Sequence, residues 1–292
     1  MTIISPPAAA AADMKKRSLV TEFKFYASSS RNWCAPFKPR SKMVMGSCYL
    51  PKEIEAKPLG EDAHFISDDE QTIGLADGVG SWAKKGIDAG QYARELMSNV
   101  LFGIKNQPKN GINPWKGLNE AFLYTESKGS STACIITLSG AADFDCLHCV
   151  NVGDSGFLII RDGKVVYESP RQQHRFNCPF QLGNSARSDT PDAAQVFVVS
   201  VEPGDIVVAG TDGVFDNLFP AEIEDLVEVC LRTRKNTPEA MASTIAHAAR
   251  QVSLLKDSVS PFGKAAMDTG LCDSASIGGK YDDITAIVAH IV

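Results

Sequence analysis

The feature that most constrains this chain is a short apolar run that ends in one aspartate beside a glycine, because the pattern occurs three times. The aspartates are Asp77 after residues 73–76, Asp154 after residues 149–152 and Asp212 after residues 206–210. Short apolar runs that stop at glycine predict buried strands with a sharp turn at the end. A single aspartate in this place is usually a turn residue. Three can bring three carboxylates to one edge of a core, and carboxylates gather in this way mainly around cations.

The order of periodic segments predicts the fold class. Strands are predicted over residues 44–50, 61–66, 72–76, 134–138, 146–152, 157–161, 165–168, 196–201, 206–209 and 284–292, and helices over residues 86–105, 114–128, 220–232 and 238–255. Consecutive strands joined by short turns favour antiparallel sheets over alternating βαβ units. We therefore expect an α+β fold, a four-layer α-β-β-α sandwich of two mainly antiparallel sheets flanked by helix pairs.

Charge divides the chain into a basic leader and an acidic body. Residues 1–50 contain eight of the 29 Lys and Arg residues and two of the 35 Asp and Glu residues, which leaves 21 basic and 33 acidic residues in the remainder. An acidic body argues against nucleic acid as a partner. No apolar run approaches the 18 residues that a membrane span needs.

Residues 1–45 are rich in Ala, Ser and basic residues and lack the apolar core of a signal peptide. This composition is typical of an organelle transit peptide, and a disordered tail or an artefact of the gene model is the alternative. We expect a leader over residues 1–45, a domain over residues 46–292, and a polar, flap-like loop over residues 170–192. Chloroplast is the expected location, with mitochondrion or cytoplasm as alternatives.

Six acids stand at predicted strand ends, and as a group they indicate a metal centre: Glu61, Asp62, Asp77, Asp154, Asp212 and Asp282. Clustered carboxylates repel one another unless a cation neutralises them. No His, Cys or Lys accompanies them in a spacing that suits zinc, so ligation by oxygen alone favours Mg²⁺ or Mn²⁺. Two such ions that share a carboxylate can lower the pKa of a water molecule and hold a phosphoryl group for in-line attack.

Six motifs occur in the order and spacing of the metal-dependent type 2C protein phosphatases, which the chain therefore resembles over residues 46–292. They are GEDAHF (60–65), LADGVGSW (75–82), GSSTA (129–133), NVGDSG (151–156), GTDGVFDN (210–217) and GGKYDDIT (278–285). CYLP (48–51) and QQHRFNCPFQL (172–182) are similar to the short plant and mitochondrial branch of that family. The resemblance implies a β-sandwich between two helical layers, with a binuclear metal centre at one end.

The resemblance also implies a role for each acid. Asp77 would bridge the two metals, and Gly78 would lend its backbone carbonyl to one of them. Asp212 and Asp282 would hold the other metal. Glu61 and Asp62 would contact metal-bound water, and Asp154 with Asp212 would hold a weaker third metal.

Two positions depart from the family pattern. Many members have an arginine that grips the substrate phosphate where this chain has Lys57, and lysine supplies charge without a bidentate fork. Many also have a histidine after Asp-Gly, proposed as the general acid, where this chain has Val79. A water molecule or another side chain would have to supply that proton.

The expected function is hydrolysis of phosphoserine and phosphothreonine in proteins by a metal-activated water, with Asp77, Asp212, Asp62 and Lys57 as the catalytic residues. The expected partner is a phosphoprotein substrate, and the expected state is a monomer. The alternative is a catalytically weak pseudophosphatase that binds phosphoproteins. Val79 and Lys57 favour the alternative, whereas the complete set of carboxylates favours the enzyme.

Overall fold

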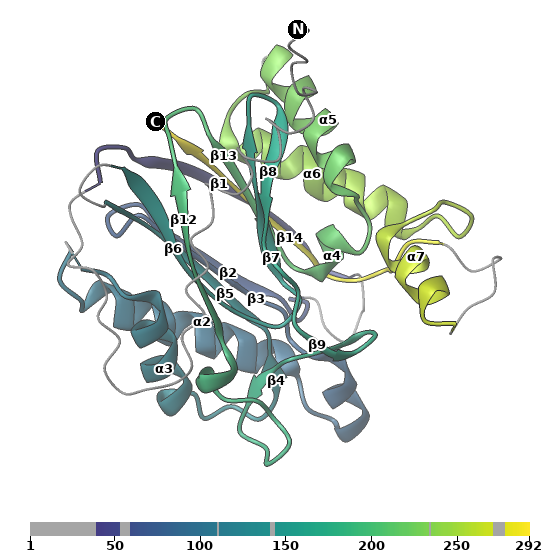
Figure 1. Ribbon diagram of the computed structural model, residues 1–292. Coiled ribbons are helices and arrows are strands. Elements are labelled where there is room, and N and C mark those ends of the chain that lie inside the picture. Colours follow the sequence, from purple (N-terminus) through teal and green to yellow (C-terminus); the bar gives the residue numbers. More distant parts are fainter. Residues whose placement is uncertain (1–38, 53–58, 110, 141–143, 234, 271–277) are drawn as a thin grey trace, which may run out of the picture.

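Two five-stranded sheets form the centre of the molecule (Figure 1). The computed structural model describes residues 39–52, 59–109, 111–140, 144–233, 235–270 and 278–292. The first sheet has the order β1 (Met43–Leu50), β14 (Ile284–Ile291), β13 (Ile206–Gly210), β7 (Gly156–Arg161) and β8 (Lys164–Glu168). The second has the order β12 (Gln195–Val201), β6 (Asp145–Val152), β5 (Ala133–Gly140), β3 (Thr72–Ala76) and β2 (Ala63–Ser67). Every neighbouring pair in both sheets is antiparallel, as the short turns predict.

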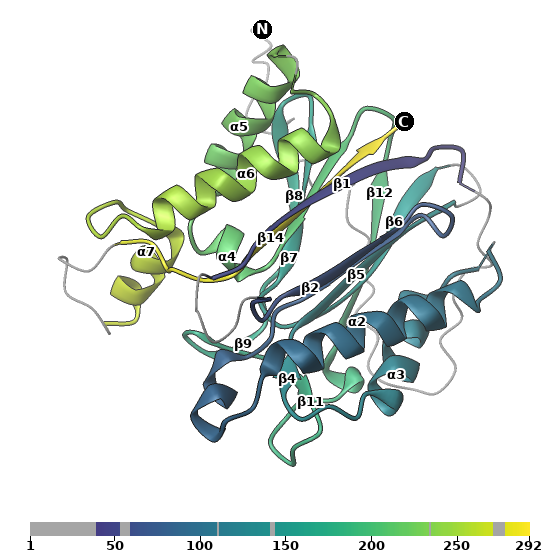
Figure 2. The ribbon, with the colours of Figure 1, turned by 180° about the vertical axis from the view of Figure 1, so that it is seen from behind.

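Helices cover the outer face of each sheet (Figure 2). The pair α2 (Ala89–Lys105) and α3 (Pro114–Tyr124) covers the second sheet, and the pair α5 (Pro220–Arg232) and α6 (Pro238–Ser253) covers the first. This arrangement confirms the four-layer α-β-β-α sandwich. Within the described residues, no helix combines the length and apolar character needed to cross a membrane.

Alternation along the strands sorts apolar side chains into three layers. Ile136 of β5 and Ile287 of β14 pack between the two sheets. Their neighbours Ile135 and Val288 point the other way, the first toward α2 and α3 and the second toward α5 and α6. Successive side chains of a strand face opposite sides of a sheet, so one strand supplies two layers. Each such burial contributes about 1.5–3 kcal/mol to stability.

Two helical segments differ from the sequence prediction. The predicted helix over residues 86–105 begins at Ala89, because Asp88 Oδ1 accepts from the Gly90 N–H at 3.0 Å and caps it. The preceding η1 (Gly80–Lys85) is a 3-10 helix. Helix α7 (Pro261–Asp268) lies between residues 255 and 284, where no helix or strand is predicted, and Ser260 Oγ caps it by accepting from the Gly263 N–H at 3.0 Å. Eight residues are too few for a reliable helical period.

The segment over residues 170–192 contains three short strands. β9 (Gln173–Arg175) pairs with β10 (Cys178–Pro179), and β11 (Leu182–Gly183) pairs with β4 (Ser130–Ser131), which leads into β5. η2 (Pro191–Ala193) ends the segment. The His174 ring stacks on Phe180 with centroids 3.8 Å apart, and His174 Nε2 lies 3.0 Å from Asp189 Oδ2. The ring stack and the β9–β10 pair lie within the segment, and the pairing of β11 with β4 joins it to the chain that leads into β5.

Candidate metal centre

Two predicted acids meet at one end of the second sheet. Asp62 directly precedes β2 and Asp77 directly follows β3, and these strands pair with Ala63 opposite Ala76. The Asp77 N–H donates to Thr132 Oγ1 at 2.9 Å, and the Asp77 carbonyl accepts from the Thr132 N–H at 2.9 Å. Asp77 is therefore carried by backbone that is held firmly beside β5.

Three further acids come from strand ends of the first sheet and from the turn that enters it. Asp212 begins α4 (Asp212–Phe215) directly beyond β13, Asp282 lies just before β14, and Asp154 lies in the turn between β6 and β7. Strand β13 pairs with both β14 and β7, so the chain segments that carry these three acids are neighbours.

Electrostatic effects show that the carboxylates of the two sheets converge. Burial raises the pKa of Asp77 well above its usual range, and the charges of Asp212, Asp62 and Asp282 raise it further. Burial raises the pKa of Asp154 to about 7, with Asp212 as the next contribution. Like charges disfavour ionisation of their neighbours only when they are close. We call these five residues, Asp62, Asp77, Asp154, Asp212 and Asp282, the acidic cluster.

Three buried oxygens of the acidic cluster have no hydrogen-bond partner among the described residues, namely Oδ1 of Asp62, Asp154 and Asp212. The other oxygen of Asp62 is well paired, because it accepts from the hydroxyls of Thr211 at 2.8 Å and Thr285 at 2.7 Å. Buried polar atoms are normally paired, and an unpaired carboxylate oxygen is costly. A cation would satisfy all three oxygens.

Gly78 lies close to the backbone of two other segments, at Glu61 and Ala89. Its N–H donates to the Glu61 carbonyl at 3.1 Å. A Cβ at position 78 would lie 2.6 Å from the Glu61 carbonyl oxygen and 2.9 Å from that of Ala89. Only glycine fits without moving the backbone on which Glu61 and Asp62 lie.

Asp283 joins three segments around the acidic cluster through hydrogen bonds. The sequence analysis did not identify it as a site residue. Its Oδ1 accepts from the Lys52 N–H at 2.7 Å and from the Tyr49 hydroxyl at 3.0 Å. Its Oδ2 accepts from the Glu61 N–H at 3.0 Å. The end of β1, the approach to β2 and the start of β14 are thus joined by one carboxylate. The adjacent pair Asp282 and Asp283 could have indicated a second role. Successive side chains near a strand point to opposite sides, so only one of the two acids can face the acidic cluster.

Lys280 was also missed, and it stands among the acids. Its Nζ pairs with Asp212 and lies 3.3 Å from Asp282 Oδ2 and 3.2 Å from Asp216 Oδ2. Burial raises the pKa of Asp212, but the Lys280 ammonium, together with Asp77 and Arg171, holds that pKa below its usual value. Lys280 could not be identified from the sequence, because its partner Asp212 lies 68 residues away in the chain.

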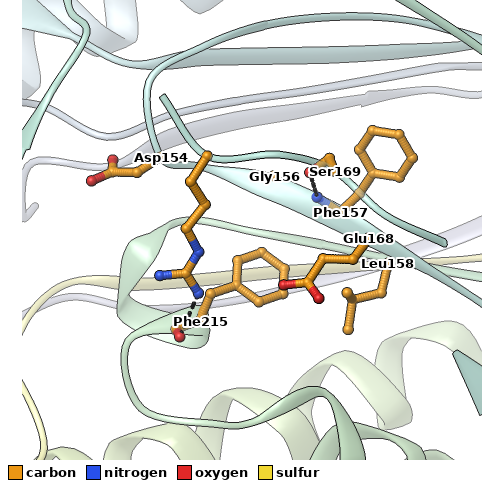
Figure 3. Close-up of a pocket in the computed structure, with 8 residues that line it drawn as sticks. Asp154, Gly156, Phe157, Leu158, Glu168, Ser169 and Phe215 are labelled. Carbon is orange, nitrogen blue, oxygen red and sulfur yellow. Dashed lines mark hydrogen bonds between the residues drawn. The ribbon is translucent and has the colours of Figure 1, made fainter. Parts of the chain in front are cut away.

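A small cavity lies beside Asp154, lined in part by Phe157 and Phe215 (Figure 3). Arg171 at its wall bonds Asp216 Oδ1 at 3.0 Å through Nη1 and donates to the Phe215 carbonyl at 2.6 Å through Nη2. The cavity measures about 10 Å³, which is room for about one water molecule. It is too small for a phosphoryl group, although Asp154 of the acidic cluster lines it.

Lys57 and Val79 are the two positions that depart from the family pattern, and the structure describes only the second. Lys57 lies outside the described residues. Val79 directly precedes η1, and its N–H donates to the Ser130 carbonyl at 2.9 Å. Its half-buried side chain has no proton to give.

The donor set fits hard divalent cations. The acidic cluster offers carboxylate oxygens, which Mg²⁺ and Mn²⁺ prefer. As they stand, the described residues include no group of three or more His, Cys, Asp or Glu side chains arranged to hold a metal. The Lys280 ammonium lies among the carboxylates, so a metal would have to draw them away from it.

Relatives are found among protein phosphatases, although no protein-family model matches the chain. The chain is 48% identical over 250 residues to "Probable protein phosphatase 2C 55" of Arabidopsis thaliana, covering 86% of this chain and 52% of the relative. It is 36% identical over 288 residues to "Protein phosphatase PTC7 homolog fig" of Drosophila grimshawi, covering 91% and 92%. The chain spans about half the length of the first plant relative.

Solved structures share the architecture. The photosystem II phosphatase PBCP is 32% identical, with a TM-score of 0.78 over 86% of this chain and 99% of that one. The catalytic domain of the serine/threonine phosphatase PstP, in complex with two manganese ions, is 14% identical with a TM-score of 0.59, covering 86% and 99%. At 14% identity the second likeness concerns the fold alone.

Proposed function

The chain belongs to the metal-dependent type 2C protein phosphatases, and from this premise we propose that it hydrolyses phosphoserine and phosphothreonine in proteins, as a monomer, at a centre of two Mg²⁺ or Mn²⁺ ions. The observation that carries the proposal is the acidic cluster, with three buried oxygens that lack partners among the described residues. The PstP domain supports it, because that relative in fold is in complex with two manganese ions.

Each proposed ligand comes from a strand end described above. Asp77 would be the ligand common to both ions, Gly78 would contribute its carbonyl oxygen, and Asp212 and Asp282 would hold one ion. Asp154 with Asp212 would hold a third, weaker ion. When bound, such ions lower the pKa of a water molecule and neutralise the charge of a phosphoryl group.

The residues around the proposed centre orient the attacking water. Asp62 is held by Thr211 and Thr285 through Oδ2, which leaves Oδ1 to accept from that water. Glu61 lies beside it on backbone tied to Gly78 and Asp283. Lys57 draws the phosphate in as a point charge. The attack would be direct, and since Val79 donates no proton, a water molecule or another side chain would have to protonate the departing alkoxide.

A phosphatase assay tests the proposal. The purified protein should release phosphate from a phosphothreonine peptide when Mn²⁺ or Mg²⁺ is present and stop when EDTA is added, because the charge of the transferred group is then no longer neutralised. Free phosphate, measured by a dye or a coupled enzyme, gives the rate.

The same assay judges the second candidate function. Val79 removes the general acid that many relatives use, and this favours a pseudophosphatase that binds phosphoproteins without hydrolysing them. A protein that binds Mn²⁺ and phosphopeptide but releases no phosphate with several metals and peptides would establish that function instead.

We infer a chloroplast location, with mitochondrion or cytoplasm as alternatives and residues 1–45 as the address. The composition of that leader supports the inference, as does the likeness to the photosystem II phosphatase PBCP. A fluorescent fusion of residues 1–292 should co-localise with chlorophyll in plant cells, and a fusion of residues 39–292, which keeps all of β1, should not. Identical distributions of the two fusions would show that the leader is no address.

A further inference from the structure

Lys280 carries a buried ammonium group into the acidic cluster from the segment before β14. Its Nζ pairs with Asp212 and lies within 3.3 Å of carboxylate oxygens of Asp282 and Asp216. Only 17% of the Lys280 side chain is exposed. An ammonium surrounded by three carboxylates is a cation already bound by the oxygens of the protein itself.

The backbone of Lys280 is clamped separately from these ion pairs. Its N–H donates to Asn217 Oδ1 at 2.9 Å, and its carbonyl accepts from Asn217 Nδ2 at 2.9 Å. The same Nδ2 donates to the Gly213 carbonyl in α4 at 2.9 Å. The ring of Phe262 in α7 lies 5.7 Å from Nζ. The side chain can therefore change partners while the backbone stays in place.

A divalent ion would need the same carboxylates. Asp212 and Asp282 are the residues that the proposed function assigns to one metal, and both lie beside Nζ. A metal ion and an ammonium group a few ångströms apart repel each other strongly in a buried site. Lysine is a compact charge on a flexible stem, and Asp216, outside the proposed ligand set, offers it a place to withdraw to.

We propose that Lys280 is an intramolecular competitor of the metal: its ammonium balances the charge of the metal-free site and leaves Asp212 and Asp282 when a divalent ion binds. The inference rests on the proposed function, since it takes those two residues as ligands. Lys280 thus stabilises the metal-free protein and weakens its affinity for metal. The metal concentration at which the site fills is set in part by this one side chain.

Calorimetric titration with Mn²⁺ alone tests the competition without any substrate. The variant Lys280→Met should bind Mn²⁺ about tenfold more tightly at its strongest site, because a repelling charge has been removed. Its unfolding temperature without metal should fall, since the carboxylates lose their counter-charge. The rise in that temperature when Mn²⁺ is added should exceed the wild-type rise.

A matched control is Lys164→Met. This variant removes an exposed lysine of the edge strand β8, which pairs with Glu224 of α5 at 3.0 Å. Its Mn²⁺ affinity should equal that of the wild type. The double variant Lys280→Met, Asp216→Asn removes one charge of each sign, so it provides a folded protein if the single variant is too unstable. It should also bind Mn²⁺ more tightly than the wild type.

The outcomes separate the two proposals. Unchanged or weaker Mn²⁺ binding in both Lys280 variants, with normal binding by the wild type, would overturn the competition and leave the proposed function standing. Absence of Mn²⁺ binding in the wild type and in both variants would overturn the metal centre and the competition together.

Discussion

Replacing Asp212 by asparagine should lower metal-dependent phosphate release by about 100- to 1,000-fold, the loss typical when one electrostatic partner of a charged transition state is removed. Asp212 is central to the acidic cluster: it is paired with Lys280 and is the largest charge contribution to the pKa of both Asp77 and Asp154. Asparagine keeps the shape and loses the charge. The rate with a phosphothreonine peptide and the Mn²⁺ affinity by calorimetry should therefore fall together.

The control for Asp212→Asn is Asp225→Asn, the same chemical change at an exposed position of α5. It should leave both the rate and the Mn²⁺ affinity at wild-type values. A wild-type rate in Asp212→Asn would show that the acidic cluster is not the reaction centre. A lower rate with unchanged Mn²⁺ affinity would remove Asp212 from the ligand set.

The second large effect is expected at Asp283. The variant Asp283→Ala should lower the free energy of unfolding by about 3 kcal/mol or more, since hydrogen bonds to charged groups contribute about 1.5–3 kcal/mol each and the abandoned donors stay partly buried. The donors are the N–H groups of Lys52 and Glu61 and the Tyr49 hydroxyl. Glu61 would lose its anchor, so Mn²⁺ affinity should fall by about 10- to 100-fold, as for other residues that position metal ligands.

Two further variants make this result specific. Asp283→Asn keeps one acceptor oxygen and should lose less stability than Asp283→Ala, whereas Asp225→Ala on exposed α5 should lose almost none. Denaturant unfolding followed by fluorescence measures all three. If Asp283→Ala were as stable as Asp225→Ala, the three hydrogen bonds would contribute nothing and the joining role of Asp283 would be wrong.

Much of the architecture follows from local pattern. Alternating apolar residues and short turns predict antiparallel strands, and the hairpin over residues 62–76 places Asp62 and Asp77 side by side because its strands are adjacent in sequence. Helix α7 could not be predicted, since eight residues are too few to establish a helical period. The ligand roles remain predictions for every residue of the proposed centre: Glu61, Asp62, Asp77, Gly78, Asp154, Asp212 and Asp282. Lys57 lies outside the described residues.

Local sequence pattern predicts the succession of strands along the chain, the two-sheet fold and the acids that end those strands. It can do so because burial and turning depend on a few neighbouring residues. The groups that pair with those acids and hold them in place follow only from the tertiary structure. Lys280 pairs with Asp212 across 68 residues of chain, and Asp283 meets Glu61 across 222. The partner of a buried charge depends on which distant segment folds against it, and local periodicity carries no information about that choice.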